Sequence, residues 1–227
     1  MTSTSTDLHA GGLQRFRHIA IEGPIGVGKS SLARRLAAHL GADLMLEQPA
    51  ENPFLDRFYE DMPGYAFQTQ LFFLFQRVKQ VQALAQPGMF SHAVVADFVF
   101  AKDALFAKLT LSDDEHRLYT QMYAQVAPQV GDPDLVIWLQ ASPDTLMQRI
   151  ARRGLPMERA IEPAYLQRIC DAYAEYFERY DGPLFVLGTE RFNPVDRDAD
   201  FHALVERLER FGGPRESFDA PGAAPLV

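Results

Sequence analysis

A glycine-rich segment near the N-terminus constrains this chain more than any other feature. Residues 23–30 read GPIGVGKS, and this spacing of glycine, lysine and serine is typical of a loop that binds phosphate groups. The apolar segment His18 to Glu22 predicts a buried strand before the loop. Leucines recur every four residues in 32–40, ahead of a glycine, and predict a helix after it. Strand, loop and helix in this order indicate a phosphate site rather than an ordinary glycine-rich turn.

The residue types of this loop account for its expected chemistry. Glycines let backbone N–H groups approach phosphate oxygens, and the N-terminus of the following helix adds a favourable dipole. Lys29 can reach the β- and γ-phosphates of a nucleotide, and the hydroxyl group of Ser30 can bind Mg²⁺. The residues expected to hold the nucleotide are Gly23, Gly26, Val27, Gly28, Lys29, Ser30 and Ser31.

Composition and charge exclude several classes of protein. The chain has 227 residues, of which 47% are hydrophobic, so we expect one folded domain. A formal net charge of −8 argues against a broad nucleic-acid-binding surface. The single cysteine, Cys170, cannot form an intrachain disulfide bond. Because the chain shows neither a signal peptide nor an apolar run of membrane-spanning length, we expect a cytoplasmic protein with no membrane partner.

The rest of the chain alternates between short apolar segments and helical patterns. The further predicted strands are Ala42 to Leu46, Ala93 to Ala96, Leu135 to Leu139 and Leu184 to Leu187. The predicted helices are Tyr65 to Leu84, two within Ala104 to Val126, Pro143 to Arg153, Pro163 to Tyr180 and Asp198 to Phe211. This alternation predicts an α/β fold with a five-stranded parallel sheet and helices on both faces. The compositions of 1–14 and 212–227 predict flexible tails around one domain at 15–211.

Two carboxylates follow predicted strands, at the edge of a parallel sheet where ligands bind. Glu47 comes after the second strand and could accept a proton from a hydroxyl group that attacks a γ-phosphate. Asp97 ends the third strand and could bind Mg²⁺ directly or through water. Either residue could instead be a solvated turn residue, although the phosphate-binding loop favours a functional Asp97.

The helix from Tyr65 carries a polar face that could read a flat ring. Gln70, Phe73 and Arg77 share one face because they are three and four residues apart. A carboxamide, an aromatic ring and a guanidinium group suit a heterocycle, but a solvated stripe of an amphipathic helix has the same pattern. The residues expected to pack in the core from the other face are Phe67, Leu71, Phe75 and Val78.

A basic segment ends the helix Pro143 to Arg153. Arg149 and Arg153 are four residues apart and share a face, and Gly154 to Pro156 then breaks the helix. The pattern is typical of a lid that closes arginines onto transferring phosphates. It is also typical of a cationic helix C-terminus that the helix dipole stabilises.

Together these segments resemble the deoxynucleoside kinase family from about His18 to Phe211. The most specific matches, after Glu47, are ENPFL at 51–55, FYED at 58–61, FQTQ at 67–70 and QR at 76–77. The resemblance implies a three-layer P-loop kinase fold with an arginine-bearing lid. It implies transfer of the γ-phosphate of ATP, with Mg²⁺, to the 5′-hydroxyl of a deoxynucleoside, with a lean toward purines. Family members are often homodimers built on helices, which the apolar excess of Leu71 to Leu84 permits.

The resemblance also implies roles for single residues. Glu47 would be the general base for the 5′-hydroxyl, or Asp97 would be the base with Glu47 assisting the metal. The substrate-binding residues implied are Tyr59 and Glu158 at the 3′-hydroxyl, Gln70 at the base, and Arg77 with Asp103 as a charged pair above it. Arg149 and Arg153 match the lid arginines that contact ATP.

Two positions depart from the family pattern. The Asp-Arg-Ser signature is here Asp97-Phe98-Val99, and Leu155 replaces a third lid arginine. Lys102 could replace the missing cation as a further catalytic residue, although its point charge does not reproduce the forked contacts of arginine. The alternative is an exposed lysine paired with Asp103.

Three other functions remain open on the sequence alone. A nucleoside monophosphate kinase holds a dianionic acceptor and would need several arginines near Gln70, where the chain offers Arg77. A regulatory nucleotide-binding switch would need a guanine-selective Asn/Thr-Lys-x-Asp element, which the sequence lacks. A catalytically impaired nucleotide-binding module is the third alternative, because the signature arginine is missing.

Overall fold

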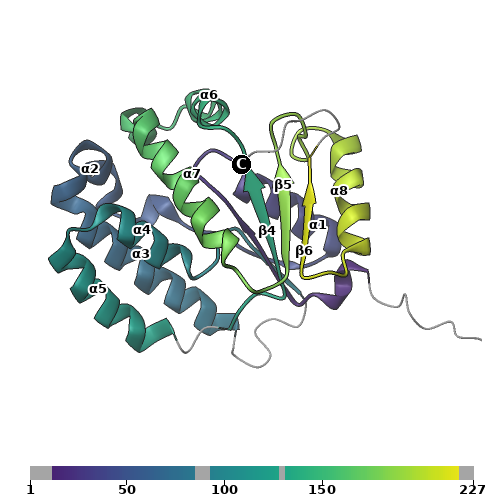
Figure 1. The fold of residues 1–227 in the computed structure, drawn as a ribbon, viewed down its shortest axis with the longest axis horizontal. Helices are drawn as coiled ribbons and strands as arrows, with labels where there is room; N and C mark the ends of the chain where they lie inside the picture. Colours follow the sequence, from purple (N-terminus) through teal and green to yellow (C-terminus); the bar gives the residue numbers. More distant parts are fainter. Residues whose placement is uncertain (1–11, 85–92, 128–130, 220–227) are drawn as a thin grey trace, which may run out of the picture.

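A parallel β-sheet with helices on both faces forms the centre of the protein (Figure 1). The computed structural model describes residues 12–84, 93–127 and 131–219, and the statements below concern these residues. The strands run in the order β2-β3-β1-β4-β5-β6, and each pair of neighbours is parallel. In these ranges no helix has the length and hydropathy that crossing a membrane requires.

The sheet contains the five predicted strands and one more. The strands are β1 (His18–Glu22), β2 (Asp43–Met45), β3 (Val94–Ala96), β4 (Leu135–Gln140), β5 (Leu184–Gly188) and β6 (Arg215–Phe218). The prediction of five strands, and of a flexible tail from residue 212, is therefore wrong for residues 215–218. The sequence does not predict strand β6, because it is a short edge strand with alternating exposed and half-buried residues. Residues 1–11 and 220–227 of the expected tails lie outside the described residues.

The predicted helices are present, with one addition. The helices are α1 (Lys29–Leu40), α2 (Leu55–Glu60), α3 (Met62–Leu84), α4 (Lys102–Thr110), α5 (Asp113–Val126), α6 (Pro143–Arg153), α7 (Pro163–Glu178) and α8 (Asp198–Arg210). Short 3₁₀ helices are η1 (Leu13–Arg15), η2 (Pro49–Glu51) and η4 (Pro156–Ala160). Helix α2 was not predicted, since six residues are too few for a periodic pattern. Gly41 and Gly154 end α1 and α6 in the left-handed conformation, as the sequence indicates.

The strands are apolar because both faces of the sheet are covered. Four of the five residues of β1 and all five of β5 are buried, and buried parallel strands need continuous apolar runs. Strand β1 lies between β3 and β4, and Ala96 at the end of β3 pairs with both Ala20 and Met45. The segments that leave β1, β2 and β3 therefore emerge side by side at one edge of the sheet.

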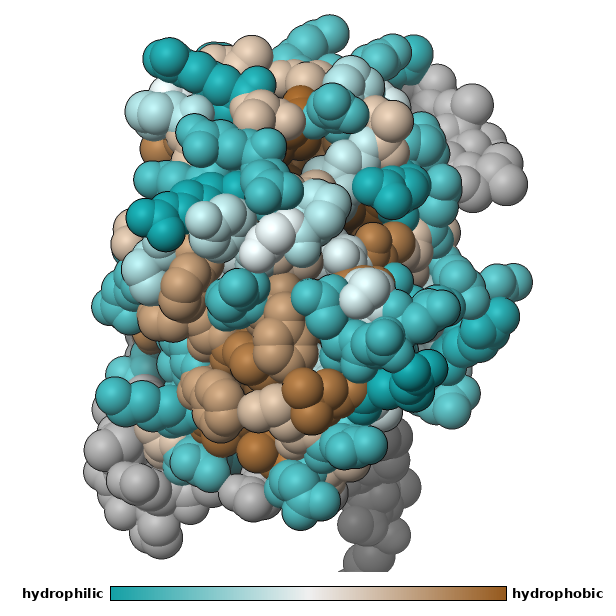
Figure 2. Space-filling view, turned by 90° about the vertical axis from the view of Figure 1, so that its left-hand side faces the viewer, coloured by the Kyte–Doolittle hydropathy of each residue, from teal (hydrophilic) through white to brown (hydrophobic). Residues whose placement is uncertain are grey.

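One predicted core position is wrong. Phe75 on α3 is 54% exposed, whereas Val78 is buried and Phe67 and Leu71 are partly buried against α4 and α5. The helical period places these residues on neighbouring sides of α3, but α5 covers only part of that surface. Figure 2 shows apolar residues gathered on this side of the molecule.

Candidate active site

The loop between β1 and α1 has the backbone shape that phosphate binding needs. Gly23, Gly26 and Gly28 have φ angles of 145°, 85° and 105°, which favour glycine. A Cβ atom at Gly23 would collide with the carbonyl group of Leu139, and one at Gly26 would press on the side chain of Ile150. A side chain at either position would therefore displace the loop, which lies between the strand and the helix that the sequence predicts.

Lys29 places a positive charge inside this loop. Its Nζ donates to the carbonyl oxygens of Gly23 at 2.8 Å and Pro24 at 3.1 Å. Burial and the neighbouring charge of Lys102 lower the pKa of Lys29 to about 8. The ammonium group is thus held near the backbone amides that would surround a phosphate group.

Ser30 and Asp97, predicted as the metal pair, are in contact. The hydroxyl of Ser30 donates to Oδ2 of Asp97, and the N–H of Glu47 donates to Oδ1 of Asp97 at 2.7 Å. Burial, together with the charge of Glu47, raises the pKa of Asp97. Hydroxyl and carboxylate oxygens are ligands that Mg²⁺ prefers, so the pair fits this ion.

The protein offers few other metal ligands here. Within the described ranges, no group of three or more His, Cys, Asp or Glu side chains is arranged to hold a metal ion. A cation at Ser30 and Asp97 would therefore take most of its ligands from nucleotide phosphates and water, as Mg²⁺ commonly does in kinases.

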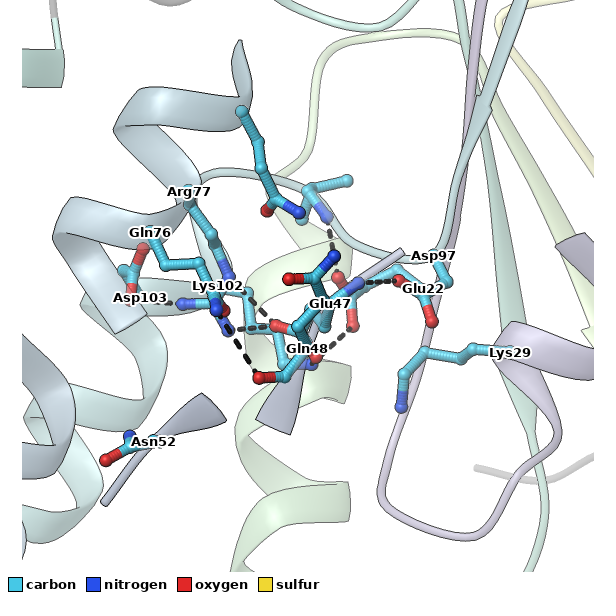
Figure 3. A network of polar contacts seen from close by, with 12 residues as sticks. Glu22, Lys29, Glu47, Gln48, Asn52, Gln76, Arg77, Asp97, Lys102 and Asp103 are labelled. Atoms are coloured by element: carbon cyan, nitrogen blue, oxygen red, sulfur yellow. Dashed lines mark hydrogen bonds and ion pairs between the residues drawn. The ribbon is translucent and has the colours of Figure 1, made fainter. Parts of the chain in front are cut away.

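Glu47 binds two cations (Figure 3). Its Oε1 accepts from Nε of Arg77 at 2.9 Å and also from Nη2, while its Oε2 accepts from Nζ of Lys102 at 2.7 Å. Burial alone would raise the pKa of Glu47, but the charges of Arg77 and Lys102 lower it well below its usual range. Glu47 is therefore ionised and held in one orientation.

Arg77 also forms the predicted pair with Asp103, through Nη1. Asp103 is fully buried, and its Oδ2 has no hydrogen-bond partner in the described part of the chain. Burial raises the pKa of Asp103 to about 7, although Arg77 opposes this shift. Arg77 therefore bonds to two carboxylates, Glu47 and Asp103, and lowers the pKa of both.

Lys102 is not the exposed lysine of the alternative interpretation. Its side chain is 9% exposed, and its ammonium group bonds to Glu47 rather than to Asp103. Oε1 of Glu22 lies 4.0 Å from the same nitrogen. Burial would lower the pKa of Lys102, but Glu47 and Glu22 raise it.

A cavity of about 170 Å³ opens beside this network, and we name it the aromatic cavity. Its aromatic walls are Phe58, Tyr59, Phe73, Phe106 and Tyr165. Its polar lining is Lys29, Ser30, Glu47, Thr69, Gln70, Arg77, Asp97, Lys102, Arg153 and Glu158. The amide of Gln70 donates to the hydroxyl of Thr110 at 3.4 Å. Flat walls with a few polar groups suit an aromatic heterocycle that carries hydroxyl groups.

Most of the predicted substrate-binding residues meet in the aromatic cavity. Those that line it are Glu47, Tyr59, Gln70, Arg77 and Glu158. Asp103 does not line it, because it lies behind Arg77 with no exposed surface.

A second cavity of about 300 Å³ lies on the other side of the phosphate-binding loop, and we name it the loop cavity. Of the predicted nucleotide-binding residues, its lining includes Gly26, Val27, Gly28, Ser31, Arg149 and Arg153. Arg149 donates to the hydroxyl of Thr189 at 2.9 Å and to its carbonyl oxygen at 2.6 Å. Arg153 lines both cavities and pairs with Glu158, with Nε 3.0 Å from Oε2. Gly23 lines neither cavity.

Several residues of the site were not predicted. Glu22 is buried directly before the loop, Thr69 lines the aromatic cavity, and Thr189 and Phe192 line the loop cavity. Thr189 follows β5 directly, so the same strand-end rule that indicated Glu47 would have found it. Glu22 ends the predicted strand His18 to Glu22, so the same rule applies to it, whereas no local pattern marks Thr69 or Phe192.

Comparisons with known proteins find relatives of this chain. The model of the family "Deoxynucleoside kinase" matches residues 19–211. A deoxyguanosine kinase of Bacillus subtilis is 36% identical over 156 residues, which are 68% of this chain and 75% of that protein. A deoxyadenosine kinase of Lactobacillus acidophilus is 32% identical, over 78% of this chain and 87% of that protein. The solved structure of deoxyadenosine kinase from M. mycoides with the products dCMP and dCDP superposes with a TM-score of 0.73. It is 27% identical, and the match covers 84% of this chain and 98% of that one.

We expect Asp103→Asn to change how stability depends on pH. The folded protein holds the Asp103 proton up to a pH of about 7, while an unfolded chain releases it near pH 4. This carboxyl group therefore favours folding at low pH, and its contribution is lost as the pH rises to about 7. Between about pH 5 and pH 8, the free energy of unfolding of the parent should fall by roughly 2–4 kcal/mol relative to the variant. Urea denaturation at several pH values measures this difference, and parallel curves would contradict it.

Proposed function

This chain belongs to the deoxynucleoside kinase family and is an ATP-dependent kinase of deoxynucleosides; we propose that it phosphorylates the 5′-hydroxyl of purine deoxynucleosides in nucleotide salvage. One observation carries the assignment of sites. The aromatic cavity and the loop cavity meet at the phosphate-binding loop, and Gly26 and Arg153 line both. We assign the nucleoside to the aromatic cavity and ATP to the loop cavity, so that the γ-phosphate lies between them.

The purine preference rests on the relatives. The relatives from Bacillus subtilis and Lactobacillus acidophilus described above are named as deoxyguanosine and deoxyadenosine kinases. Gln70 would pair with the base, because a carboxamide can donate and accept at once. Tyr59 and Glu158 would hold the 3′-hydroxyl.

Incubation with MgATP and each of the four deoxynucleosides or their 5′-monophosphates tests this function. We expect deoxyadenosine or deoxyguanosine to give a 5′-monophosphate with the highest kcat/KM. A product from monophosphates alone would indicate a nucleoside monophosphate kinase. Binding of ATP without any product would indicate the impaired module.

The charges of the aromatic cavity support a neutral acceptor. Arg77 is already paired with Glu47 and Asp103, and Lys102 is paired with Glu47. A dianionic phosphate would lie against Glu47 and compete with it for both cations, at a large electrostatic cost. A nucleoside hydroxyl can donate a hydrogen bond to Glu47 without that cost.

The contacts of Glu47 and Asp97 support different roles for the two carboxylates. One carboxylate oxygen of Asp97 accepts a hydrogen bond from the hydroxyl of Ser30, and the other accepts one from the N–H of Glu47. We therefore assign Asp97 and Ser30 to Mg²⁺ binding. When bound with ATP, this ion would neutralise charge on the β- and γ-phosphates. Glu47 lines the aromatic cavity and is ionised, so we assign it as the base that accepts the 5′-hydroxyl proton.

We expect Glu47→Gln to lower kcat by about 10²–10⁴-fold, since the amide keeps the shape but cannot accept a proton. Steady-state kinetics with saturating MgATP measures the loss, and a thermal melt shows whether the variant folds. Asp97→Asn is the matched comparison: its main effect should be a weaker response to Mg²⁺ concentration. If Asp97→Asn instead shows the large loss of kcat and Glu47→Gln leaves kcat nearly unchanged, the two roles are reversed.

Cations around the γ-phosphate would stabilise the charge that develops in transfer. Lys29 in the loop and the lid arginines Arg149 and Arg153 belong to this group. Lys102 joins them as the substitute for the missing signature arginine: its position between Glu22 and Glu47 supports a role at the attacking hydroxyl.

A homodimer through α3 and α5 is the quaternary structure that we propose. Two large apolar side chains are exposed there, Phe75 at 54% and Leu118 at 50%, on the side where Figure 2 shows apolar residues gathered. Exposed apolar area of this kind is typical of an interaction surface. The cytoplasmic location expected from the sequence stays a prediction.

We expect Phe75→Glu to convert the dimer to a monomer. The monomeric variant should still fold, because the side chain of Phe75 packs in no core. Sedimentation velocity on the parent and the variant measures the change. A parent that sediments as a monomer at micromolar concentration would contradict the proposal.

A further inference from the structure

A buried carboxylate outside the predicted site residues lies among the active-site loops. Glu22 is the last residue of β1, and its side chain has no exposed surface. An ionised carboxylate in such a place is unfavourable unless hydrogen bonds and cations compensate for lost hydration. The partners of Glu22 therefore indicate what the residue does.

Three hydrogen bonds join Glu22 to three different elements. Its Oε1 accepts from the N–H of Gly23 at 3.0 Å and from the hydroxyl of Tyr173 on α7 at 2.7 Å. Its Oε2 accepts from the N–H of Val99 at 2.7 Å. Gly23 begins the phosphate-binding loop, and Val99 lies two residues after Asp97. One side chain thus ties the loop that would bind phosphate to the segment that carries Asp97.

The three donors require a carboxylate. They approach both oxygens of Glu22, and an ionised carboxylate is acceptor-only at both. A glutamine in the same position would turn its NH₂ group toward at least one of these donors. The buried acid is therefore matched to its surroundings by charge as well as by shape.

The charge of Glu22 also acts on Lys102. Nζ of Lys102 lies 4.0 Å from Oε1 of Glu22 and 2.7 Å from Oε2 of Glu47, so the ammonium group has a carboxylate on two sides (Figure 3). The ring of Phe106 lies 5.6 Å away. When a substrate hydroxyl donates a hydrogen bond to Glu47, Glu22 is the second carboxylate that holds Lys102 in place.

We propose that Glu22 is a positioning residue for phosphoryl transfer, which holds Lys102 and the Asp97 segment in their working geometry. The proposal rests on the roles proposed above for Lys102 and Asp97. Glu22 lines neither the aromatic cavity nor the loop cavity, so it acts through other residues. Loss of its charge should therefore slow the chemical step and leave nucleoside binding nearly unchanged.

The first test is Glu22→Gln, assayed with saturating MgATP and the best deoxynucleoside. We expect kcat to fall at least about tenfold, since misplaced groups in phosphoryl transfer carry losses of this order. The KM for the nucleoside should change by less than about threefold, and circular dichroism should show a folded protein. A kcat within about threefold of the parent would overturn the proposal.

A second substitution distinguishes positioning from general weakening of the fold. Lys102→Met alone should lower kcat at least about tenfold, and a thermal melt shows whether the variant is folded at the assay temperature. If Glu22 acts through Lys102, the double variant should be no more than about threefold slower than Lys102→Met. If the two losses multiply in full, Glu22 acts without Lys102, and the part of the proposal that concerns Lys102 is overturned.

Asp134→Asn is the matched control. Asp134 accepts the N–H groups of Arg17 at 2.7 Å and His18 at 2.9 Å, at the opposite end of β1 from Glu22. The same acid-to-amide change there loosens the strand far from the phosphate-binding loop, so kcat should be unchanged. An equal loss of kcat in both variants would assign the effect to the strand and overturn the proposal.

Tyr173→Phe keeps the test decisive if Glu22→Gln does not fold. It removes one hydrogen bond to Oε1 of Glu22 but keeps the charge, and should lower kcat by about two- to fivefold at unchanged nucleoside KM. An unchanged kcat would count against positioning. A parent that phosphorylates no deoxynucleoside would contradict the proposed function, whereas an active parent with unaffected variants would contradict only the role of Glu22.

Discussion

Two buried cations share one carboxylate, and the active site of this kinase depends on that arrangement. Arg77 comes from α3, Lys102 from α4, and Glu47 from the segment after β2. None of these charges would be stable in its buried position alone, because an unpaired buried ion costs several kcal/mol. The ion network therefore fixes α3, α4 and the segment after β2 relative to one another, and it forms part of the wall of the aromatic cavity. Stability and chemistry use the same residues, so a substitution here is expected to affect both.

The parallel sheet brings these groups to one edge. Because β1 lies between β3 and β4, and β3 also pairs with β2, the residues that follow the first three strands leave the sheet beside each other. Asp97 bonds to Ser30 from one neighbour and to the N–H of Glu47 from the other. A sheet of this kind aligns the glycine loop, Asp97 and Glu47, although they are far apart in the sequence.

Local patterns were enough to predict most of the elements, the phosphate-binding loop and the carboxylates at the strand ends, whereas Tyr59 and Glu158 came from the family resemblance. The glycine loop, the apolar strands and the strand-end carboxylates are signals carried by a few neighbouring residues. Strand β6 and the exposure of Phe75 could not be predicted in this way. Pairing at a sheet edge, and how much of α3 is covered by neighbouring helices, depend on segments that are distant in the sequence. The partners of Lys102 and the burial of Glu22 are also set by contacts over long sequence separations. Carboxylates at strand ends can thus be predicted from the sequence, but contacts such as those of Lys102 with Glu47 and Glu22 cannot.

The sixth strand has a consequence for how the protein is made. Strand β6 pairs with β5, and the ring of Phe218 packs edge-on against Phe192, 5.0 Å away, in the wall of the loop cavity. Since α8 separates β5 from β6 along the chain, the ribosome must release a whole helix and a further strand before this edge is covered. Until then β5 exposes unpaired backbone groups, which are prone to pair with other chains. During synthesis, the wall of the loop cavity at Phe192 is therefore supported only after β6 has joined the sheet.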